Sequence, residues 1–122
     1  MKMSMRTFET GATRNDDGDA LEYARFLSPL ALKRYAEYMH KNRVQADGEI
    51  RDPDNWKKGM TTRSFMDSDF RHLMDLWLIH DGYAGEARGD AEEALCGILF
   101  NTIGYLHEVL KDKQPAAQQE QK

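Results

Sequence analysis

The chain has 122 residues, of which 40% are hydrophobic and 31% are charged. This length fits one domain with its own core and excludes two independent domains. The composition excludes collagen-like and wholly disordered chains. With 17 basic and 21 acidic residues the formal net charge is −4. The balance gives no strong signal for nucleic-acid binding, which depends on a concentrated basic surface.

Three features predict a cytoplasmic protein with no membrane association. No run approaches the ~20 apolar residues that a membrane-spanning helix needs. Residues 1–6 lack the apolar run of a signal peptide. The single cysteine, Cys96, excludes an intrachain disulfide, which suits a reducing compartment. We expect Cys96 to be a small buried hydrophobic residue.

Residues 1–27 have the composition of a loop, with glycines, threonines and an Asn-Asp-Asp run. Asp19 and Glu22 are spaced as the capping box of one short helical turn, but the apolar residues around them suit an extended arm equally. We expect a mostly irregular arm. No segment of the chain alternates with period two for long enough to predict a strand.

The first helix has a clear start at Ser28 and Pro29, since a serine side chain accepts from free amides and proline suits the first helical position. Apolar residues at helical spacing predict that it runs to about Asn42. Residues 43–61 are too rich in Gly, Asp, Asn and Pro to continue it. Loops of this length are uncommon and are often functional.

Two further helices follow. The second is predicted from Thr62 or Ser64 to about His80, where large apolar residues recur at helical spacing. After a Gly-rich link, Asp90 is a natural N-cap for the third, which is predicted to run to about Lys111.

The predicted fold class is therefore all-α, a small helical bundle over residues 28–111 that carries two long irregular loops. The arm 1–27 precedes it and a disordered tail, 112–122, follows it. Three helices bury their apolar faces poorly, and a bundle core usually needs four. We expect a homo-oligomer with the third helix at or near the interface, through Leu95, Ile98, Leu99, Ile103 and Leu106.

His72 and Asp75 lie three residues apart and so share a face of the second helix. An imidazole and a carboxylate can bind a divalent cation together, although a hydrogen bond or ion pair within the helix is the commoner role. Glu92 and Glu93 belong to an acidic cluster at the start of the third helix, where negative charge is usually favourable to the helix itself.

The third helix also carries a line of small and polar residues, Gly97, Asn101 and Gly104. A glycine inside a helix costs roughly 1 kcal/mol relative to alanine. Either close helix packing or a ligand near the backbone can offset that cost, and a polar line on an apolar helix is where a bundle would build a site.

The loop between the first two helices contains Asn55, Trp56, Lys57 and Lys58. An indole can stack on a base while adjacent lysines reach phosphate oxygens, but Trp56 could equally anchor the loop on the core. In the arm, the segment that ends at Arg14 offers hydroxyls, a flexible backbone and a guanidinium, which suit an anion.

Taken in order, five segments resemble a family of small phage-encoded proteins, the N-terminal domain of dATP/dGTP diphosphohydrolases. The segments are TGATR, SPLALKRYAEYMHKNR, RDPDNWKKGM, DFRHLMDLW and DAEEALCGILFNTIGYLHEVL. The resemblance implies hydrolysis of a purine deoxynucleoside triphosphate to monophosphate and pyrophosphate with Mg²⁺ or Mn²⁺, in the cytoplasm of the host cell. The wider group of helical pyrophosphatases uses E-x-x-E and E-x-x-D ligands, where this chain has His72-x-x-Asp75 and the acidic cluster, so an HD-like site stays possible.

Residue chemistry and resemblance together give one hypothesis for the site. His72, Asp75 and Glu93 hold the metal ion, and metal-bound water attacks phosphorus in line. The remaining residues are assigned as follows: Arg71 and Glu92 to catalysis, Lys57, Lys58 and Arg14 to the outer phosphates, and Trp56, Asn55 and Asn101 to substrate binding. Two alternatives stay open, a catalytically silent nucleotide-binding protein and a helical phage protein that binds a host protein.

Overall fold

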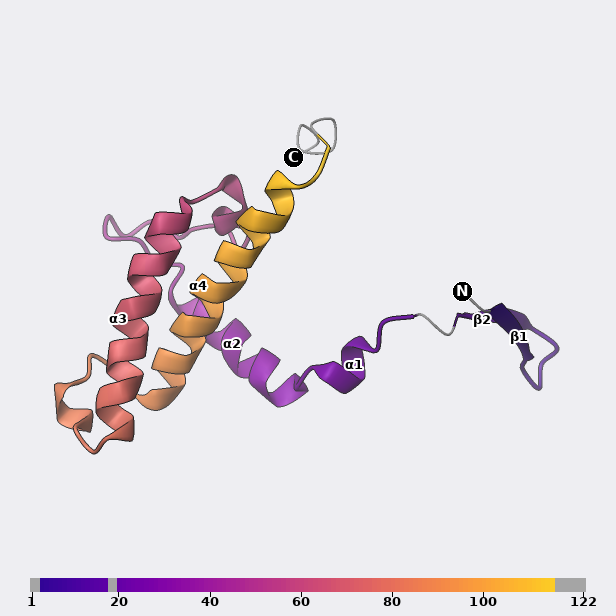
Figure 1. Cartoon of the computed structure of the whole chain (residues 1–122), viewed down its shortest axis with the longest axis horizontal. Coiled ribbons are helices and arrows are strands. Elements are labelled where there is room, and N and C mark those ends of the chain that lie inside the picture. The colour runs from indigo at the N-terminus through magenta and orange to yellow at the C-terminus, as the bar shows by residue number, and fades with distance from the viewer. Residues whose placement is uncertain (1–2, 18–19, 116–122) are drawn as a thin grey trace. The chain divides into compact units, whose positions relative to one another are not determined.

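The computed structural model describes residues 3–17 and 20–115 and is mostly helical, with one small two-stranded sheet (Figure 1). The predicted tail lies largely outside the described residues. The chain divides into two units, Met1–Leu32 and Lys33–Lys122. In chain order the elements are β1 (Met3–Thr7), β2 (Thr13–Asp17), α1 (Tyr23–Phe26), α2 (Pro29–Lys41), η1 (Asn55–Lys58), α3 (Thr62–His80), η2 (Ala84–Glu86) and α4 (Ala91–Asp112).

The first unit contains a β-hairpin, so the prediction of an irregular arm without strands is wrong there. β1 pairs antiparallel with β2, and Thr7 lies opposite Thr13. The turn closes through the amide of Phe8, which donates to the carbonyl of Ala12 at 2.8 Å, and Gly11 adopts φ 91°, a left-handed conformation that glycine tolerates. The strands lack an alternating apolar pattern, because backbone pairing rather than burial defines them, and periodicity could not reveal them.

One short helical turn, α1, follows the hairpin. The sequence allowed either a short helical turn or an extended arm here, and the structure has a helical turn. The Glu22 side chain, however, makes no capping hydrogen bond. Asp19, the other half of the predicted capping box, lies outside the described residues.

All three predicted helices are confirmed, and so are the predicted caps Ser28 and Asp90, whereas the cap of α3, Thr61, was not predicted. Ser28 Oγ accepts from the amide of Ala31 at 3.1 Å at the start of α2. Thr61 Oγ1 accepts from Ser64 at the start of α3. Asp90 Oδ1 accepts from the amide of Glu93 at 2.8 Å at the start of α4. Each cap satisfies an amide that has no partner within its helix.

α3 and α4 lie side by side and antiparallel in the second unit (Figure 1). The buried face of α4 is the line of small and polar residues, which includes Gly97, Asn101 and Gly104. A Cβ added to Gly97 would come within 2.7 Å of the His72 ring, and one added to Gly104 within 2.6 Å of the Phe65 ring. The close-packing explanation of the two glycines is therefore confirmed.

Several large apolar side chains of α4 are exposed in the single chain, whereas Phe100 packs edge-on against Phe65 of α3. Leu106 is 54% exposed, and Leu95, Ile103 and Leu110 are exposed to a similar degree. α3 also leaves Phe70, Trp77 and other large apolar residues open to solvent. Among the described residues the buried hydrophobic side chains are few: Phe65, Ala94 and Cys96. None of the helices in the described part of the chain has the length and apolar character of a membrane span.

Candidate functional site

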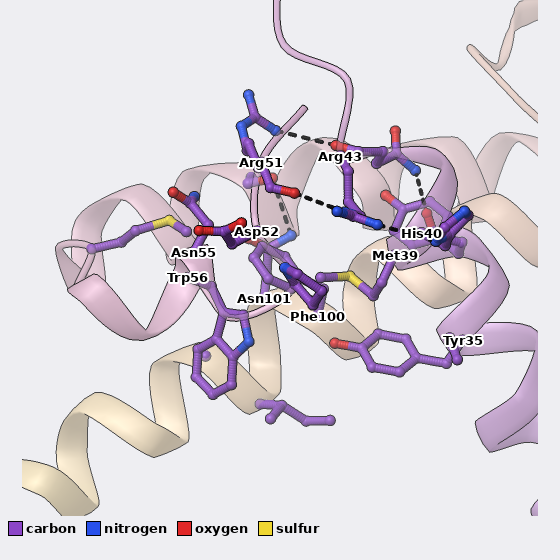
Figure 2. Close-up of a pocket in the computed structure, with 18 of the residues that line it drawn as sticks. Tyr35, Met39, His40, Arg43, Arg51, Asp52, Asn55, Trp56, Phe100 and Asn101 are labelled. Atoms are coloured by element: carbon purple, nitrogen blue, oxygen red, sulfur yellow. Dashed lines mark hydrogen bonds between the residues drawn. The ribbon is translucent and has the colours of Figure 1, made fainter. Parts of the chain in front are cut away.

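A pocket of about 720 Å³ opens in the second unit between α2, the loop after it, α3 and α4 (Figure 2). Its walls combine aromatic and apolar side chains with cationic and amide groups. The aromatic and apolar residues are Tyr35, Tyr38, Met39, Val44, Trp56, Met60, Phe100 and Ile103, and the polar ones include His40, Asn42, Arg43, Arg51, Asp52, Asn55, Ser68, His72 and Asn101. Burial raises the pKa values of Tyr35 and Tyr38, so both phenols are neutral hydrogen-bonding groups at pH 7.

Two guanidinium groups at the edge of this pocket are fixed by the loop that carries them. Arg43 Nε donates to the carbonyl of Arg51 at 2.7 Å, and Arg51 Nη1 donates to the carbonyl of Asn42 at 3.2 Å. An antiparallel bridge between Val44 and Ile50 closes the loop. Sequence reasoning missed this pair. The Asp47-Gly48 turn, with Gly48 at φ 87°, is the signal that could have placed Arg43 beside Arg51.

Trp56 both anchors its loop and lines the pocket. Its ring packs edge-on against His107, with 4.9 Å between ring centroids. The next turn of chain is tied to α4 as well, because Glu108 Oε1 accepts from the amide of Met60 at 3.4 Å. Lys111 pairs with Glu108 and is the main reason that the pKa of Glu108 is lowered. The anchoring alternative is thus confirmed, and stacking on a base stays a prediction.

The predicted phosphate-binding residues do not line this pocket. Lys57 and Lys58 are exposed on η1, with Lys57 Nζ 5.8 Å from the centroid of the Trp56 ring. Arg14 lies on β2, in the first unit, where it pairs in register with Arg6. Asn55 and Asn101, in contrast, both line the pocket.

Asn101 is held rigidly at the α3–α4 contact and is 3% exposed. Its Nδ2 donates to the Gly97 carbonyl at 2.8 Å and to Ser68 Oγ at 3.1 Å. The first bond joins residues four apart on α4 and the second joins α4 to α3, so the side chain has one orientation.

A smaller pocket of about 210 Å³ adjoins the large one, since Tyr38, Asn42 and His72 line both. The three predicted metal ligands, His72, Asp75 and Glu93, all line this smaller pocket. The sequence analysis grouped these three residues, and in the structure they do line one cavity, although they come from two helices, α3 and α4.

The carboxylate of Asp75 is already engaged by Arg88, a residue that sequence reasoning missed. Asp75 is 7% exposed, and its Oδ2 lies 2.8 Å from Arg88 Nε and 2.7 Å from Nη2. The amide of Arg88 donates to Asp75 Oδ1 at 3.2 Å. These bonds hold the pKa of Asp75 below its ordinary value.

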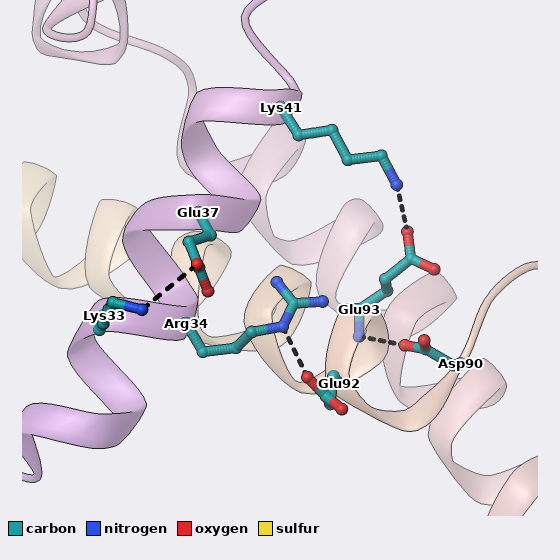
Figure 3. Close-up of polar contacts among 7 residues, drawn as sticks. All are labelled: Lys33, Arg34, Glu37, Lys41, Asp90, Glu92 and Glu93. Atoms are coloured by element: carbon teal, nitrogen blue, oxygen red, sulfur yellow. Dashed lines mark hydrogen bonds and ion pairs between the residues drawn. The ribbon is translucent and has the colours of Figure 1, made fainter.

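The other two predicted metal ligands, Glu93 and His72, are also affected by neighbouring residues: Glu93 accepts a hydrogen bond, and the pKa of His72 is changed. Glu93 Oε2 accepts from Lys41 Nζ at 3.3 Å (Figure 3). Burial, reinforced by Arg88, lowers the pKa of His72. Among residues 3–17 and 20–115, no three His, Cys, Asp or Glu side chains are grouped so that they could hold a metal ion. As placed, the three residues do not fit a metal ion, because Arg88 neutralises the central carboxylate.

The two predicted catalytic residues lie outside both pockets. Arg71 is exposed on α3. Glu92 accepts from Arg34 Nε at 2.6 Å, a surface contact that ties the start of α4 to α2 (Figure 3). Together with the Lys41–Glu93 pair, this contact makes the acidic cluster part of the attachment of α2.

Comparison of the chain with protein-family models, with curated proteins and with solved structures finds no match.

Proposed function

We propose that the chain binds a purine deoxynucleotide in the large pocket and, with Mg²⁺ or Mn²⁺, hydrolyses the triphosphate to monophosphate and pyrophosphate in phage nucleotide metabolism. The observation that carries the proposal is the pocket itself. Its volume of about 720 Å³ lies in the range of ~300–1,000 Å³ that small-molecule sites occupy. Aromatic walls and a pair of guanidinium groups meet in it, which suits a ligand with a flat base and an anionic end.

The base belongs among the aromatic residues. Trp56, Tyr35 and Phe100 come from three different segments and face one cavity (Figure 2). Base–aromatic stacking contributes ~1–3 kcal/mol per base. Because the Trp56 ring is already held by His107, little side-chain freedom is lost when a base stacks on it.

The phosphates belong at the cationic edge. Arg43 and Arg51 are held there by backbone carbonyls, and each guanidinium has further N–H groups to offer a phosphate. Lys57 and Lys58, exposed on η1 next to Trp56, remain our proposed contacts for the outer phosphates. Because Asp75 is paired with Arg88, we assign the metal ion to the phosphates of the nucleotide and not to His72, Asp75 and Glu93.

A homo-oligomer is the proposed assembly. The support is the exposed apolar surface on α3 and α4, which includes Leu106, Leu95, Phe70 and Trp77. Two copies that pack these helices together would complete a four-helix bundle and cover that surface. Light scattering should give at least twice the 14.1 kDa of one chain. Leu106→Glu should lower the mass, whereas Ile50→Glu, on the exposed loop, should leave it unchanged.

A second candidate is a nucleotide-binding protein without catalysis, which the Asp75–Arg88 ion pair favours. A thermal-shift titration with dATP, repeated with and without Mn²⁺, together with detection of pyrophosphate, separates the two. Hydrolysis supports the enzyme, and a raised melting temperature without pyrophosphate release supports the silent binder. No shift with any deoxynucleotide would contradict both and leave the third alternative, a protein that binds a host protein.

A further inference from the structure

The amide of Asn101 presents one fixed hydrogen-bond acceptor to the large pocket. An amide nitrogen carries two hydrogens, and both are used, on the Gly97 carbonyl and on Ser68 Oγ. The Gly97 carbonyl can only accept, so a flipped amide would set two acceptors against each other. The Oδ1 atom has no partner among the residues that the structure describes and stays available to a ligand.

A fixed acceptor in a nearly buried position selects its ligand. Leaving such a group unpaired costs ~1–3 kcal/mol, and placing a second acceptor against it is worse. Tyr35, Tyr38 and Ser68 line the same cavity and carry hydroxyl groups, but within the described residues none of them donates to Oδ1. The ligand atom that meets Asn101 must therefore be a donor.

We propose that Asn101 makes this pocket selective for adenine over 6-oxo purines, an inference that rests on the proposed function. In a purine nucleotide the sugar is attached at N9, and the substituent at C6 lies at the far end of the base. Arg43, Arg51 and Asn101 line one cavity (Figure 2), so a nucleotide whose phosphate is bound by the two arginines would direct that far end toward Asn101. The 6-amino group of adenine donates to Oδ1, whereas the 6-oxo group of guanine or hypoxanthine sets a second acceptor at the same place. The N1–H of a 6-oxo purine would reach Oδ1 only if the whole base moved within the pocket, away from the position that Arg43 and Arg51 give its phosphate.

Asn55 supplies the matched control. It also lines the pocket, but on η1, where it is only half-buried and its side chain has no described partner. No hydrogen bond within the described residues fixes which atom of its amide, the donor or the acceptor, faces a ligand, so we expect Asn55 not to discriminate between the two kinds of purine.

The test is calorimetric titration with dAMP, dGMP and 2′-deoxyinosine monophosphate, which lack the bond that the proposed reaction hydrolyses. We expect the wild-type chain to bind dAMP at least about tenfold more tightly than either 6-oxo nucleotide, because the mismatch leaves a buried acceptor unpaired. Asn101→Leu should reduce the ratio to within about twofold. Asn55→Ala should keep the wild-type ratio.

The outcomes separate this inference from the proposed function. Equal binding of the three nucleotides, or preference for dGMP, overturns the selectivity and leaves the binding function intact. Loss of the ratio in Asn55→Ala rather than in Asn101→Leu also overturns it. If none of the three binds, the proposed function fails and the inference fails with it. The wild-type ratio decides the point even if Asn101→Leu does not fold.

Discussion

Replacing Gly104 by alanine tests the packing that positions the pocket. The new methyl carbon would lie 2.6 Å from Phe65 Cζ, whereas carbon atoms in contact prefer about 3.5–4.0 Å. Phe65 is 1% exposed, so its ring cannot move into solvent. Alanine gains about 1 kcal/mol of helix propensity, and overpacking a core costs ~1–3 kcal/mol. Because the Phe65 ring is confined, we expect the upper end of that cost, ~3 kcal/mol. We expect a net loss of about 2 kcal/mol.

Urea denaturation followed by circular dichroism at 222 nm measures this loss. The protein concentration must be fixed, because the stability of an oligomer depends on it. Gly85→Ala is the matched control, since nothing lies within 4 Å of its added Cβ. Its stability should stay within about 0.5 kcal/mol of the wild type. The Gly104→Ala variant should also melt roughly 5–10 °C lower.

A double-mutant cycle with Phe65→Leu identifies the cause. If the methyl group collides with the ring, shortening the side chain should recover part of the loss, so the two changes together should cost less than their sum. A Gly104→Ala variant as stable as the wild type, or more stable, would refute the close contact between α3 and α4.

Three further predictions concern charge. The pKa of His72 is lower in the folded chain than in the unfolded one, so the free energy of unfolding should fall as the pH drops below ~6.5, the ordinary pKa of histidine. Melting temperatures measured over a series of acidic pH values should show this fall, and His72→Gln should make it smaller. Asp75→Asn should lower the melting temperature, because Arg88 loses the carboxylate it is paired with, whereas Glu92→Gln, at an exposed ion pair, should change it little; an Asp75→Asn chain as stable as the wild type would contradict the pairing. Changing Lys57 and Lys58 together to alanine should weaken triphosphate binding more than monophosphate binding, and equal losses in titration would place them away from the phosphates.

The helices could be predicted because their signals are local. Ser28 with Pro29 and the cap at Asp90 each satisfy amides within one turn of chain, so the residue types alone mark where helices begin. The hairpin could not be predicted, because its strands carry no alternating apolar pattern. A turn containing Gly11 was visible, but backbone pairing across it was not.

The buried face of α4 is where sequence pattern is least informative. Apolar residues such as Leu106 usually mark the face that packs, yet here the small residues Gly97 and Gly104 allow α3 to approach, and Leu95, Leu106 and Leu110 stay exposed. Patterning identifies apolar stripes but does not say whether the same chain or a second copy covers them.

Some residues of the candidate site that lie on helices could be predicted, but Arg88, contributed by a loop, could not. His72, Asp75 and Glu93 do line one pocket, because helical spacing and the N-cap placed them on facing turns. Arg88 belongs to the Gly-rich link, thirteen residues from its partner, and no periodic signal connects it to Asp75. Contacts that depend on how a loop folds back lie beyond the reach of local rules.

The most direct measurement of the central claim is photo-crosslinking with 8-azido-dATP, followed by mass spectrometry of the labelled peptides. We expect an adduct on residues that line the large pocket, such as Tyr35, Trp56 or Phe100, and loss of that adduct when unlabelled dATP is in excess. An adduct only on residues outside the pocket, or labelling that excess dATP does not reduce, would contradict it.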